Sequence, residues 1–428
     1  MEGRLAVHPC ANDVRVAALI DRLGHQTTSL PSSETTTGST RSGAKFTTDH
    51  LRHRPMTGVR FRLPLTAKDA PSKIGPDGTM RASAAGAMPA RAGTVAFKNL
   101  GADMGTDDVR GRVDGLAESM WAFAVLCATA ESGLLAGLAS PRQVEEAAET
   151  AHMPVDIAAR LLDVLVALGF AARSGDTYQS VDRLQPMLTD EGIEQLLAEL
   201  RSTFQQSRDL VDRAKRGTLS AGWIHTDPEI LQAQGASGRA GARAMAEQGV
   251  PRLSGLAERL GAPSASFLDV GVGVGVIAIE MCRTYPTLRV VGLEPAEAPR
   301  REALANIKAA GYSDRIEIRD QPVETLTDVE AFDLAYLPQV FLPEDAFVRG
   351  LVTVWQALRH GGWLTLPAIS VPGSDFRAAL SRLRNTLWGG GARYPEQVAE
   401  AVVRSGFTDV EVRSVGGTMH AVVARRPA

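Results

Sequence analysis

The stretch Phe267-Leu-Asp-Val-Gly-Val-Gly-Val-Gly275 decides the fold of this chain. Its first residues end an apolar run typical of a buried strand, and its three glycines precede an apolar helical start at Val276. Glycines between a strand and a helix let a ligand approach the backbone, because no Cβ atoms block it. About 20 residues further on, a second apolar strand ends at Glu294, where an acidic residue can bind a ribose diol. The stretch predicts a site for a nucleoside-containing cofactor.

Composition limits the class of protein. With 428 residues, a hydrophobic fraction of 44% and a net charge of −3, the chain has room for two or three domains and shows no general signal for binding polyanions. Its three cysteines lie far apart and match no disulfide or metal spacing, so no metal is expected. No uninterrupted apolar run approaches the roughly 20 residues of a membrane span. We expect a soluble, cytoplasmic protein that binds no membrane and no nucleic acid.

Residues 1–105 differ from the rest of the chain. They hold a Ser/Thr-rich tract over residues 26–40 and no sustained apolar periodicity. Such a segment buries too little apolar surface to offset its chain entropy, so we expect it to be disordered. Two alternatives remain open. A basic, Ser-rich leader resembles an organelle transit peptide, and Met80, Met88 or Met104 could be the true start of a shorter chain.

Residues 106–188 are predicted to form a winged-helix domain. Its expected elements are, in order, helices over Val109–Leu138, from Ser140-Pro141 onward and over Pro154–Leu168, and a hairpin over Phe170–Tyr178. A DNA-binding winged helix would present basic residues on its third helix. That helix instead begins Pro154-Val-Asp-Ile-Ala-Ala-Arg-Leu-Leu-Asp163, with two acidic residues and one basic residue. Dimerisation is therefore favoured over DNA binding.

Residues 189–262 are expected to be a helical linker, with helices near 190–217 and 250–260. Apolar strands alternate with helices from residue 263 to residue 428, which predicts an α/β, Rossmann-like doubly wound sheet. The expected strands are Ser266–Val270, Leu288–Leu293, Arg315–Arg319, Phe332–Leu337, Trp363–Pro367, Asp409–Ser414 and Met419–Ala424. The expected helices are Val276–Thr284, Ala298–Ala310, Phe347–Leu358 and Pro395–Ser405.

The glycine spacing and the preceding acid distinguish between two cofactors. A dinucleotide site reads Gly-x-Gly-x-x-Gly, whereas this chain has Gly271, Gly273 and Gly275 at alternate positions. Asp269, just before the loop, would repel a pyrophosphate but could hydrogen-bond an ammonium group. S-adenosylmethionine carries one ammonium and no phosphate, so it is favoured over a nicotinamide dinucleotide.

At this point the residues resemble a known family, the class I S-adenosylmethionine-dependent methyltransferases. The resemblance rests on the loop from Asp269 to Gly275, on Glu294, on Arg319-Asp320-Gln321 and on Ala357-Leu-Arg-His-Gly-Gly-Trp-Leu364. Together with the preceding winged helix, the chain resembles the small-molecule O-methyltransferases of the caffeate and hydroxyindole type. In these the N-terminal domain forms an intertwined homodimer and contributes to the acceptor pocket.

The resemblance assigns roles to individual residues. It implies that the cofactor is bound by Asp269, Gly271, Gly273, Gly275, Glu294, Asp320 and Gln321. It also implies that residues 189–262 line the acceptor pocket, with Trp223 and Met245, and that Trp388 belongs to the segment that closes over the acceptor. Tyr336 and Gln339, at the end of the fourth strand, could orient an acceptor in this pocket by hydrogen bonds. Plainer alternatives stay open: a turn for Asp320, a solvated strand end for Glu294, and core packing for Met245 and Trp388.

One feature departs from the family. Its members usually carry a His that removes the proton of the acceptor hydroxyl, but alignment on Asp333 places Leu342 there and Pro338 at the position of a nearby lysine. Three interpretations remain. His225, His420 or Glu344 could supply the base; the acceptor could need no base, because the sulfonium is a strong electrophile; or the fold could have lost methyl transfer, as in relatives that hydroxylate or decarboxylate.

The sequence therefore predicts a homodimeric enzyme that transfers a methyl group from S-adenosylmethionine to a small, aromatic or polyketide-like metabolite, most simply to oxygen. The competing hypotheses are an enzyme of the same fold that has lost methyl transfer and a non-catalytic winged-helix regulator.

Overall fold

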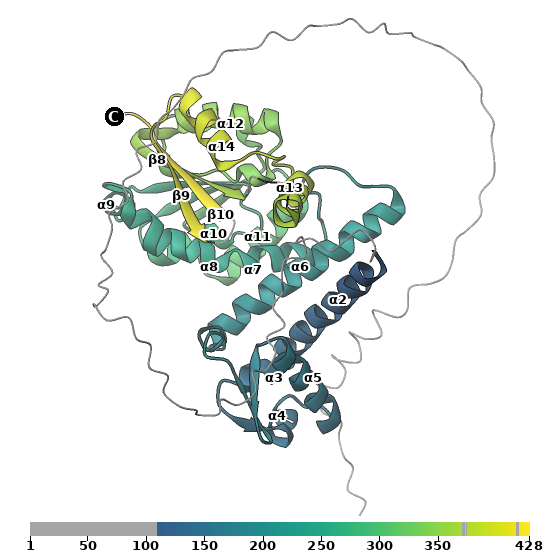
Figure 1. The fold of residues 1–428 in the computed structure, drawn as a ribbon. Coiled ribbons are helices and arrows are strands. Elements are labelled where there is room, and N and C mark those ends of the chain that lie inside the picture. The colour runs from purple at the N-terminus through teal and green to yellow at the C-terminus, as the bar shows by residue number, and fades with distance from the viewer. Residues whose placement is uncertain (1–108, 370–372, 374, 417–418) are drawn as a thin grey trace, which may run out of the picture. The chain divides into compact units, whose positions relative to one another are not determined.

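The computed structural model describes residues 109–369, 373, 375–416 and 419–428. The predicted disordered extension over residues 1–105 lies outside the described residues. Within the described part of the chain, a mainly helical segment is followed by linker helices and then by an α/β segment (Figure 1).

The N-terminal helical segment combines helices with a small antiparallel sheet of order β1-β3-β2. Its elements are α2 (Val109–Glu131), α3 (Leu134–Gly137), β1 (Arg142–Gln143), α4 (Val144–Thr150), α5 (Val155–Ala167), β2 (Ala171–Ser174) and β3 (Thr177–Ser180). Leucines from α3 and α5 pack with Tyr178 in one buried core. The assignment of this segment to the winged-helix class, with its expected role in dimerisation, stays a prediction.

Two predictions for this segment were wrong in detail. The single helix expected over Val109–Leu138 is interrupted, because Gly133 adopts a left-handed conformation (φ 79°) between α2 and α3. The helix expected from Ser140-Pro141 begins only at Val144. Arg142 and Gln143 pair with β3 instead, and these tertiary hydrogen bonds outweigh the local helix-start signal.

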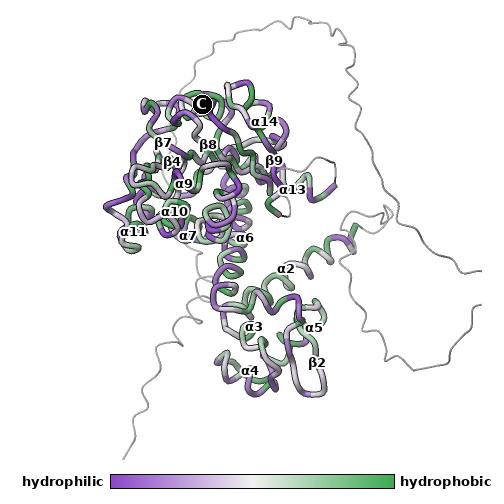
Figure 2. Tube along the Cα trace, turned by 90° about the vertical axis from the view of Figure 1, so that its left-hand side faces the viewer, coloured by the Kyte–Doolittle hydropathy of each residue, from purple (hydrophilic) through white to green (hydrophobic). Residues whose placement is uncertain are grey.

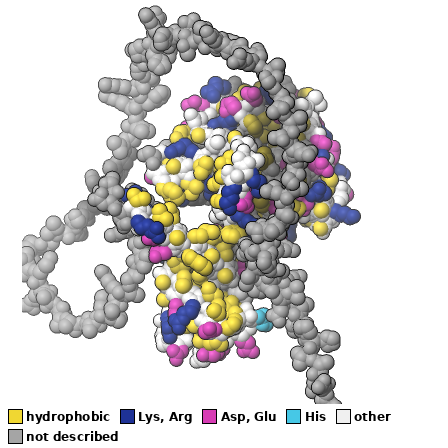
Figure 3. All heavy atoms as spheres, turned by 90° about the vertical axis from the view of Figure 1, so that its right-hand side faces the viewer, with side chains coloured by type: hydrophobic (Ala, Val, Ile, Leu, Met, Phe, Trp, Pro, Cys, Tyr) yellow, Lys and Arg dark blue, Asp and Glu magenta, His cyan; other side chains and the backbone are white. Residues whose placement is uncertain are grey.

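Helix α2 carries much of its apolar surface outward. Val113, Leu116, Met120 and Trp121 are between 53% and 76% exposed. Apolar and pale residues predominate along α2 (Figure 2), and hydrophobic side chains gather over the N-terminal helical segment (Figure 3). By length and composition α2 would also pass as a membrane span, contrary to the expectation from the sequence; taken alone, one such helix is weak evidence.

The linker contains α6 (Asp190–Arg216), α7 (Pro228–Ser237), α8 (Arg239–Ala244), a π-helical turn (Met245–Gly249), a 3-10 turn (Val250–Arg252) and α9 (Leu256–Leu260). Thr189 caps the start of α6, accepting a hydrogen bond from the Gly192 N–H, and Gly217 ends it in a left-handed conformation. The continuous helix predicted near 250–260 is broken, because Gly255 has a positive φ of 70°.

The α/β segment forms a seven-stranded sheet of order β6-β5-β4-β7-β8-β10-β9, in which β10 runs antiparallel to both of its neighbours and the other neighbouring strands are parallel. The strands are β4 (Ser266–Val270), β5 (Arg289–Leu293), β6 (Ile316–Arg319), β7 (Phe332–Tyr336), β8 (Leu358–Ile369), β9 (Thr408–Gly416) and β10 (Met419–Arg425). The helices are α10 (Val276–Thr284), α11 (Glu297–Ala309), α12 (Glu344–Ala357), α13 (Phe376–Trp388) and α14 (Pro395–Arg404). The predicted α/β doubly wound fold is confirmed.

Alternate residues of the central strand β4 enter two different cores. Phe267 packs with α9, α10 and α11 on one face of the sheet, whereas Leu268 packs with α12 and α14 on the other. The strand is therefore buried on both faces, as its nearly continuous apolar sequence indicates. This burial fixes the glycine loop at the carboxyl edge of the parallel strands, where ligands bind in such sheets.

Candidate functional site

The glycine loop turns sharply between β4 and α10. Gly271, Gly273 and Gly275 all have positive φ, between 58° and 89°. At Gly275 space is also limited, since a Cβ atom would lie 3.4 Å from Cγ1 of Ile307 on α11. The loop therefore needs glycine both for its backbone conformation and for close packing of a neighbouring helix.

Asp269 is the most unusual charged residue of the site. Its side chain is 1% exposed, and neither carboxylate oxygen has a hydrogen-bond partner among the described residues. Burial raises the pKa of Asp269 to about 8; the backbone N–H of Ala278 approaches the carboxylate closely enough to oppose the rise, and the nearby charge of Glu294 adds to it. A buried carboxylate of this kind needs a cationic or hydrogen-bonding partner.

Glu294 lies directly after β5 and holds the glycine loop. Its Oε2 accepts a hydrogen bond from the Gly273 N–H and its Oε1 accepts one from the Ala296 N–H, both at 3.0 Å. Burial raises the pKa of Glu294, and these two backbone N–H groups and Arg300 oppose the rise. Each carboxylate oxygen keeps a second lone pair for a hydroxyl donor, as binding of a diol requires.

Asp320 and Gln321 follow β6 at the same edge of the sheet. The Asp320 carboxylate is 66% exposed and lies 3.0 Å from the guanidinium of Arg300. Arg300 also donates to the backbone carbonyl of Glu294 at 2.9 Å. Gln321 donates its amide N–H to the carbonyl of Thr325. Arg300 thus joins the ends of β5 and β6, and this brings Asp320 near the Glu294 turn.

An aromatic row, made of His225, Trp223, Phe341 and Trp388, joins three distant segments of the chain. The Trp223 ring meets His225 and Phe341 edge-on, at centroid distances of 4.5 and 5.3 Å. Phe341 lies 5.4 Å from Trp388. The indole N–H of Trp388 donates to Oε1 of Gln206 on α6 at 2.8 Å. The row therefore links the segment before α7, the 3-10 helix after β7 (Gln339–Phe341) and the end of α13.

Glycines allow these three segments to meet. A Cβ atom on Gly390 would lie 2.5 Å from Cα of Val340, and one on Gly389 would lie 3.3 Å from Cα of Gly222. The Gly390 N–H also donates to the Val340 carbonyl at 2.9 Å. Gly389 and Gly390, just after the end of α13, thus serve a close backbone approach.

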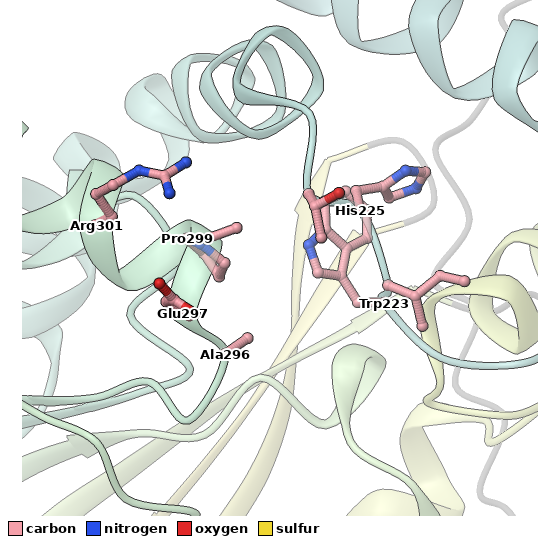
Figure 4. A pocket seen from close by; sticks show the side chains of 9 residues that line it. Trp223, His225, Ala296, Glu297, Pro299 and Arg301 are labelled. Atoms are coloured by element: carbon pink, nitrogen blue, oxygen red, sulfur yellow. The ribbon is translucent and has the colours of Figure 1, made fainter.

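A cavity of about 280 Å³ lies between the linker and the start of α11 (Figure 4). Residues 223–226 line one side of it, and residues 296–299 with Arg301 line the other. In Figure 4 the Trp223 indole projects toward Pro299 and Glu297, whereas the His225 imidazole points away from them. Because the second side begins two residues after Glu294, the cavity adjoins the predicted ribose site.

The three candidate bases lie in different surroundings. His225 Nδ1 is 3.6 Å from Oδ2 of Asp209; burial lowers the pKa of His225 and Asp209 opposes this. Glu344 is 71% exposed and forms a 2.5 Å ion pair with Arg393. His420 lies on β10, and its Nδ1 is buried without a hydrogen-bond partner in the described part of the chain. Leu342 is half-buried against the sheet core.

The remaining predicted pocket residues lie near β4, β7 and α8. Tyr336 ends β7 in register with Asp269 of β4, and burial followed by the charge of Asp269 raises the pKa of its hydroxyl. Gln339 is 1% exposed; its amide donates to the Pro367 carbonyl and its oxygen accepts from Arg393. Met245 opens the π-helical turn and packs beside the core that contains Tyr336.

Four contributors were not found from the sequence: Asp209, Phe341, Arg393 and Gly235 of α7, where a Cβ atom would lie 2.1 Å from Cγ2 of Val274 in the glycine loop. Phe341 had a usable signal, because it stands one residue before the position of the missing His. The other three act only through contacts with distant segments. Among the residues that the structure describes, none of the His, Cys, Asp and Glu side chains form a group of three or more that could hold a metal ion.

Comparisons with known proteins find similarity to methyltransferases. The sequence model of a precorrin methyltransferase domain matches residues 244–404. A precorrin-6Y C(5,15)-methyltransferase (decarboxylating) from Mycobacterium tuberculosis strain H37Rv is 33% identical over 159 residues, which are 36% of this chain. That match also spans only 36% of the length of the relative.

Solved structures resemble a larger share of the chain. The apo S-adenosylmethionine-dependent methyltransferase SibL superposes with a TM-score of 0.56 at 20% identity, over 74% of this chain and 99% of its own. Human N-acetylserotonin methyltransferase, in complex with S-adenosylmethionine, superposes with a TM-score of 0.54 at 18% identity, over 76% of this chain and 100% of its own. At such identities the likeness establishes the fold.

Proposed function

We propose that this chain, which has the fold of class I S-adenosylmethionine-dependent methyltransferases, transfers a methyl group from S-adenosylmethionine to a small, aromatic or polyketide-like metabolite, with oxygen as the methylated atom. The observation that carries the proposal is the buried Asp269 carboxylate, which lacks a partner among the described residues and adjoins the glycine loop.

The residues around this carboxylate fit S-adenosylmethionine. Its ammonium group supplies the positive charge that both oxygens of Asp269 lack. Glu294, held by the Gly273 N–H, keeps lone pairs for the ribose hydroxyls. When bound, the cofactor supplies an electrophilic methyl group on a sulfonium. An acid at the loop would repel a dinucleotide's pyrophosphate.

The aromatic row supports a flat, apolar acceptor. Phe341 immediately precedes Leu342, which occupies the position of the base in the resembled family. The Trp388 ring packs against Phe341. Leu342 cannot accept a proton, and Arg393 holds the neighbouring Glu344. The chain's contribution to catalysis is then alignment of the acceptor and exclusion of water, which suits an acidic phenol or enol hydroxyl that ionises readily.

Methylation of carbon is the second candidate. It is favoured by the precorrin methyltransferase match over residues 244–404 and by the carbon methylation stated in the name of the 33% identical relative. An electron-rich carbon also needs no base to attack a sulfonium, which agrees with Leu342. Loss of methyl transfer has no comparable support.

A cytoplasmic enzyme that binds no nucleic acid is part of the proposal. The charges that α5 and the β2–β3 hairpin would offer to DNA are paired with acids instead. Arg160 lies 2.9 Å from Asp163, and Arg173 lies 3.6 Å from Asp163 and 3.8 Å from Asp176. No salt-dependent binding to duplex DNA is expected.

Transfer of label from S-adenosylmethionine carrying a radiolabelled methyl group tests the proposal. A panel of phenols, enols, amines and electron-rich heterocycles is offered, and product mass and fragmentation identify the methylated atom.

Glu294→Ala is expected to weaken cofactor binding at least tenfold by calorimetry, because the ribose diol loses its hydrogen-bond acceptor and the glycine loop loses the carboxylate that holds it. Glu317→Ala, an exposed acid on β6, is the matched control. Equal cofactor affinity of Glu294→Ala and the unmutated chain would contradict the cofactor site.

A further inference from the structure

The cavity beside Glu294 is built from two segments that are far apart in the chain. One side is the start of α11, immediately after the acid that follows β5. The other side is the stretch Trp223–Thr226, which belongs to the linker and contributes no strand to the sheet. The cavity would therefore be an open ledge on the α/β segment if the linker were absent.

Trp223 is the large aromatic side chain of this cavity, and its neighbours restrict its position. His225 and Phe341 both meet its ring edge-on, with interplanar angles of 68° and 76°. The indole projects toward Pro299 and Glu297 across the cavity (Figure 4). The ring thus makes two aromatic contacts and also lines the cavity of about 280 Å³.

The volume of the cavity indicates which part of a ligand it can hold. Whole small-molecule pockets measure about 300 to 1,000 Å³, so this cavity is at the lower limit and suits one flat ring system better than a complete cofactor. The adjoining Glu294 is positioned for a ribose. The group attached to that ribose on the side away from the methionine is the adenine base.

We propose that Trp223 is a cofactor-positioning residue: its indole covers the adenine of S-adenosylmethionine in the cavity between the linker and the start of α11. The resemblance to the O-methyltransferases places Trp223 in the acceptor pocket instead. This inference rests on the proposed function. It adds that the linker completes the cofactor site and that the same aromatic row continues through Phe341 and Trp388 to the acceptor wall.

The chemistry of stacking sets the expected behaviour. A base on an aromatic face is stabilised by its flat π-surface, so a phenylalanine retains much of the interaction and an alanine loses it. The charged groups lining the cavity are Glu297 and Arg301, both exposed. Because one is negative and the other positive, the cavity has no excess positive charge, and neutral adenine suits it better than a phosphate.

Calorimetric titration with S-adenosylhomocysteine tests the role of Trp223, since this ligand keeps the adenosine but needs no acceptor. Trp223→Ala is expected to weaken binding tenfold or more and Trp223→Phe less than threefold. Leu219→Ala, an exposed apolar residue of the same linker, is expected to bind like the unmutated chain. Adenosine alone is expected to show the same ranking of variants. Quenching of tryptophan fluorescence by the ligand is expected to be largely lost in Trp223→Phe.

The outcomes separate the two proposals. If the unmutated chain binds S-adenosylhomocysteine and Trp223→Ala binds it equally well, Trp223 does not position the cofactor, whereas the proposed function stands. If the unmutated chain binds neither S-adenosylmethionine nor S-adenosylhomocysteine, the proposed function fails and this inference fails with it. Circular dichroism and thermal melting of Trp223→Ala and Trp223→Phe identify a variant that has lost its fold; a folded Trp223→Phe still decides through its fluorescence.

Discussion

Asp269 illustrates how one side chain can be arranged for a ligand at the expense of the fold. Its carboxylate is buried beside a second acid, Glu294, and has no hydrogen-bond donor of good geometry among the described residues. A group that served only stability would be paired or replaced by an apolar residue. The residue is therefore best understood as a destabilising element that a cation compensates.

The raised pKa of Asp269 makes a prediction about stability and pH. The folded chain keeps the proton up to about pH 8, whereas an unfolded aspartate releases it near pH 4. Between these values the folded state binds more protons, so the free energy of unfolding falls as pH rises. Asp269→Asn removes this contribution, which is on the order of 2 kcal/mol between pH 5 and 7. Thermal unfolding without cofactor, from pH 5 to 8, is expected to show a smaller decrease in Tm for Asp269→Asn.

Cofactor binding offers an independent check on the same group. An ammonium beside Asp269 favours the carboxylate, so binding of S-adenosylmethionine near pH 7 should release a proton. Calorimetry in two buffers of different ionisation enthalpy measures this release, and Asp269→Asn should lack it and bind more weakly. The pKa of Glu294 is also raised, and Glu294 affects proton uptake in both proteins in the same direction. Identical pH dependence of the two proteins would refute this account of Asp269.

At the scale of elements, the glycine loop depends on a helix that precedes it in the chain. Gly235 of α7 lies so close to the loop that a Cβ atom would be 2.1 Å from Cγ2 of Val274. Asn306 of α11 adds a hydrogen bond to the Val274 carbonyl and another to Gln232 of α7. The loop is therefore held between α7 and α11, so that the linker contributes to the shape of the proposed cofactor site.

Gly235→Ala should disturb this packing. Neither the helix backbone nor the buried Val274 can yield by the amount that a methyl group needs, so a loss of about 1–3 kcal/mol in the free energy of unfolding is expected, with weaker binding of S-adenosylhomocysteine. Urea unfolding and calorimetry measure the two effects. Gly241→Ala on α8 is the matched control, because its Cβ meets nothing within 4 Å.

A double variant adds a direct test of the contact. If Gly235→Ala acts through Val274, then shortening that valine in Gly235→Ala/Val274→Ala should recover part of the lost stability. Stability of Gly235→Ala equal to that of the unmutated chain would mean that α7 does not press on the loop.

At the scale of the whole molecule, the outward face of α2 is the feature that most needs a partner. Leu116 and Met120 lie one turn apart and are 55% and 53% exposed, and Trp121 beside them is 76% exposed. Such a surface is characteristic of an interface between proteins. We propose that a second copy of this chain covers it, as in the homodimers of the family that the sequence resembles.

The dimer is testable by mass in solution. Leu116→Lys/Met120→Lys is expected to convert a particle of two chains into one of a single chain in light scattering after size-exclusion chromatography. Val348→Lys/Val352→Lys on α12 adds the same charges to another pair of exposed apolar residues one turn apart, and should leave the mass unchanged. An unmutated chain that runs as a single copy would exclude the dimer. In that case, co-flotation with lipid vesicles would show whether α2 binds a membrane instead.

Most of the sheet could be predicted from the sequence, because its signals are local. Strand β4 is a short apolar run that ends in glycines, and β5 ends at an acid, so their positions along the chain and the cofactor site expected after them follow from adjacent residues. One error was local, a glycine taken as part of a helix, and the other arose where a tertiary contact outweighed local preference. Gly133 divides the first helix, and pairing of Arg142 with β3 delays the second.

The sequence by itself determined the α/β fold, the glycine loop and the two acids that point to a nucleoside cofactor, since strand, turn and helix signals act within a few residues. Only the tertiary structure decided that Asp269 lacks a partner among the described residues, that Gly235 lies close against Val274 of the loop and that Trp223 lines a cavity beside Glu294. The physical reason is separation along the chain. The hydrogen bond from Trp388 to Gln206 joins residues 182 positions apart, and no local pattern encodes such a contact.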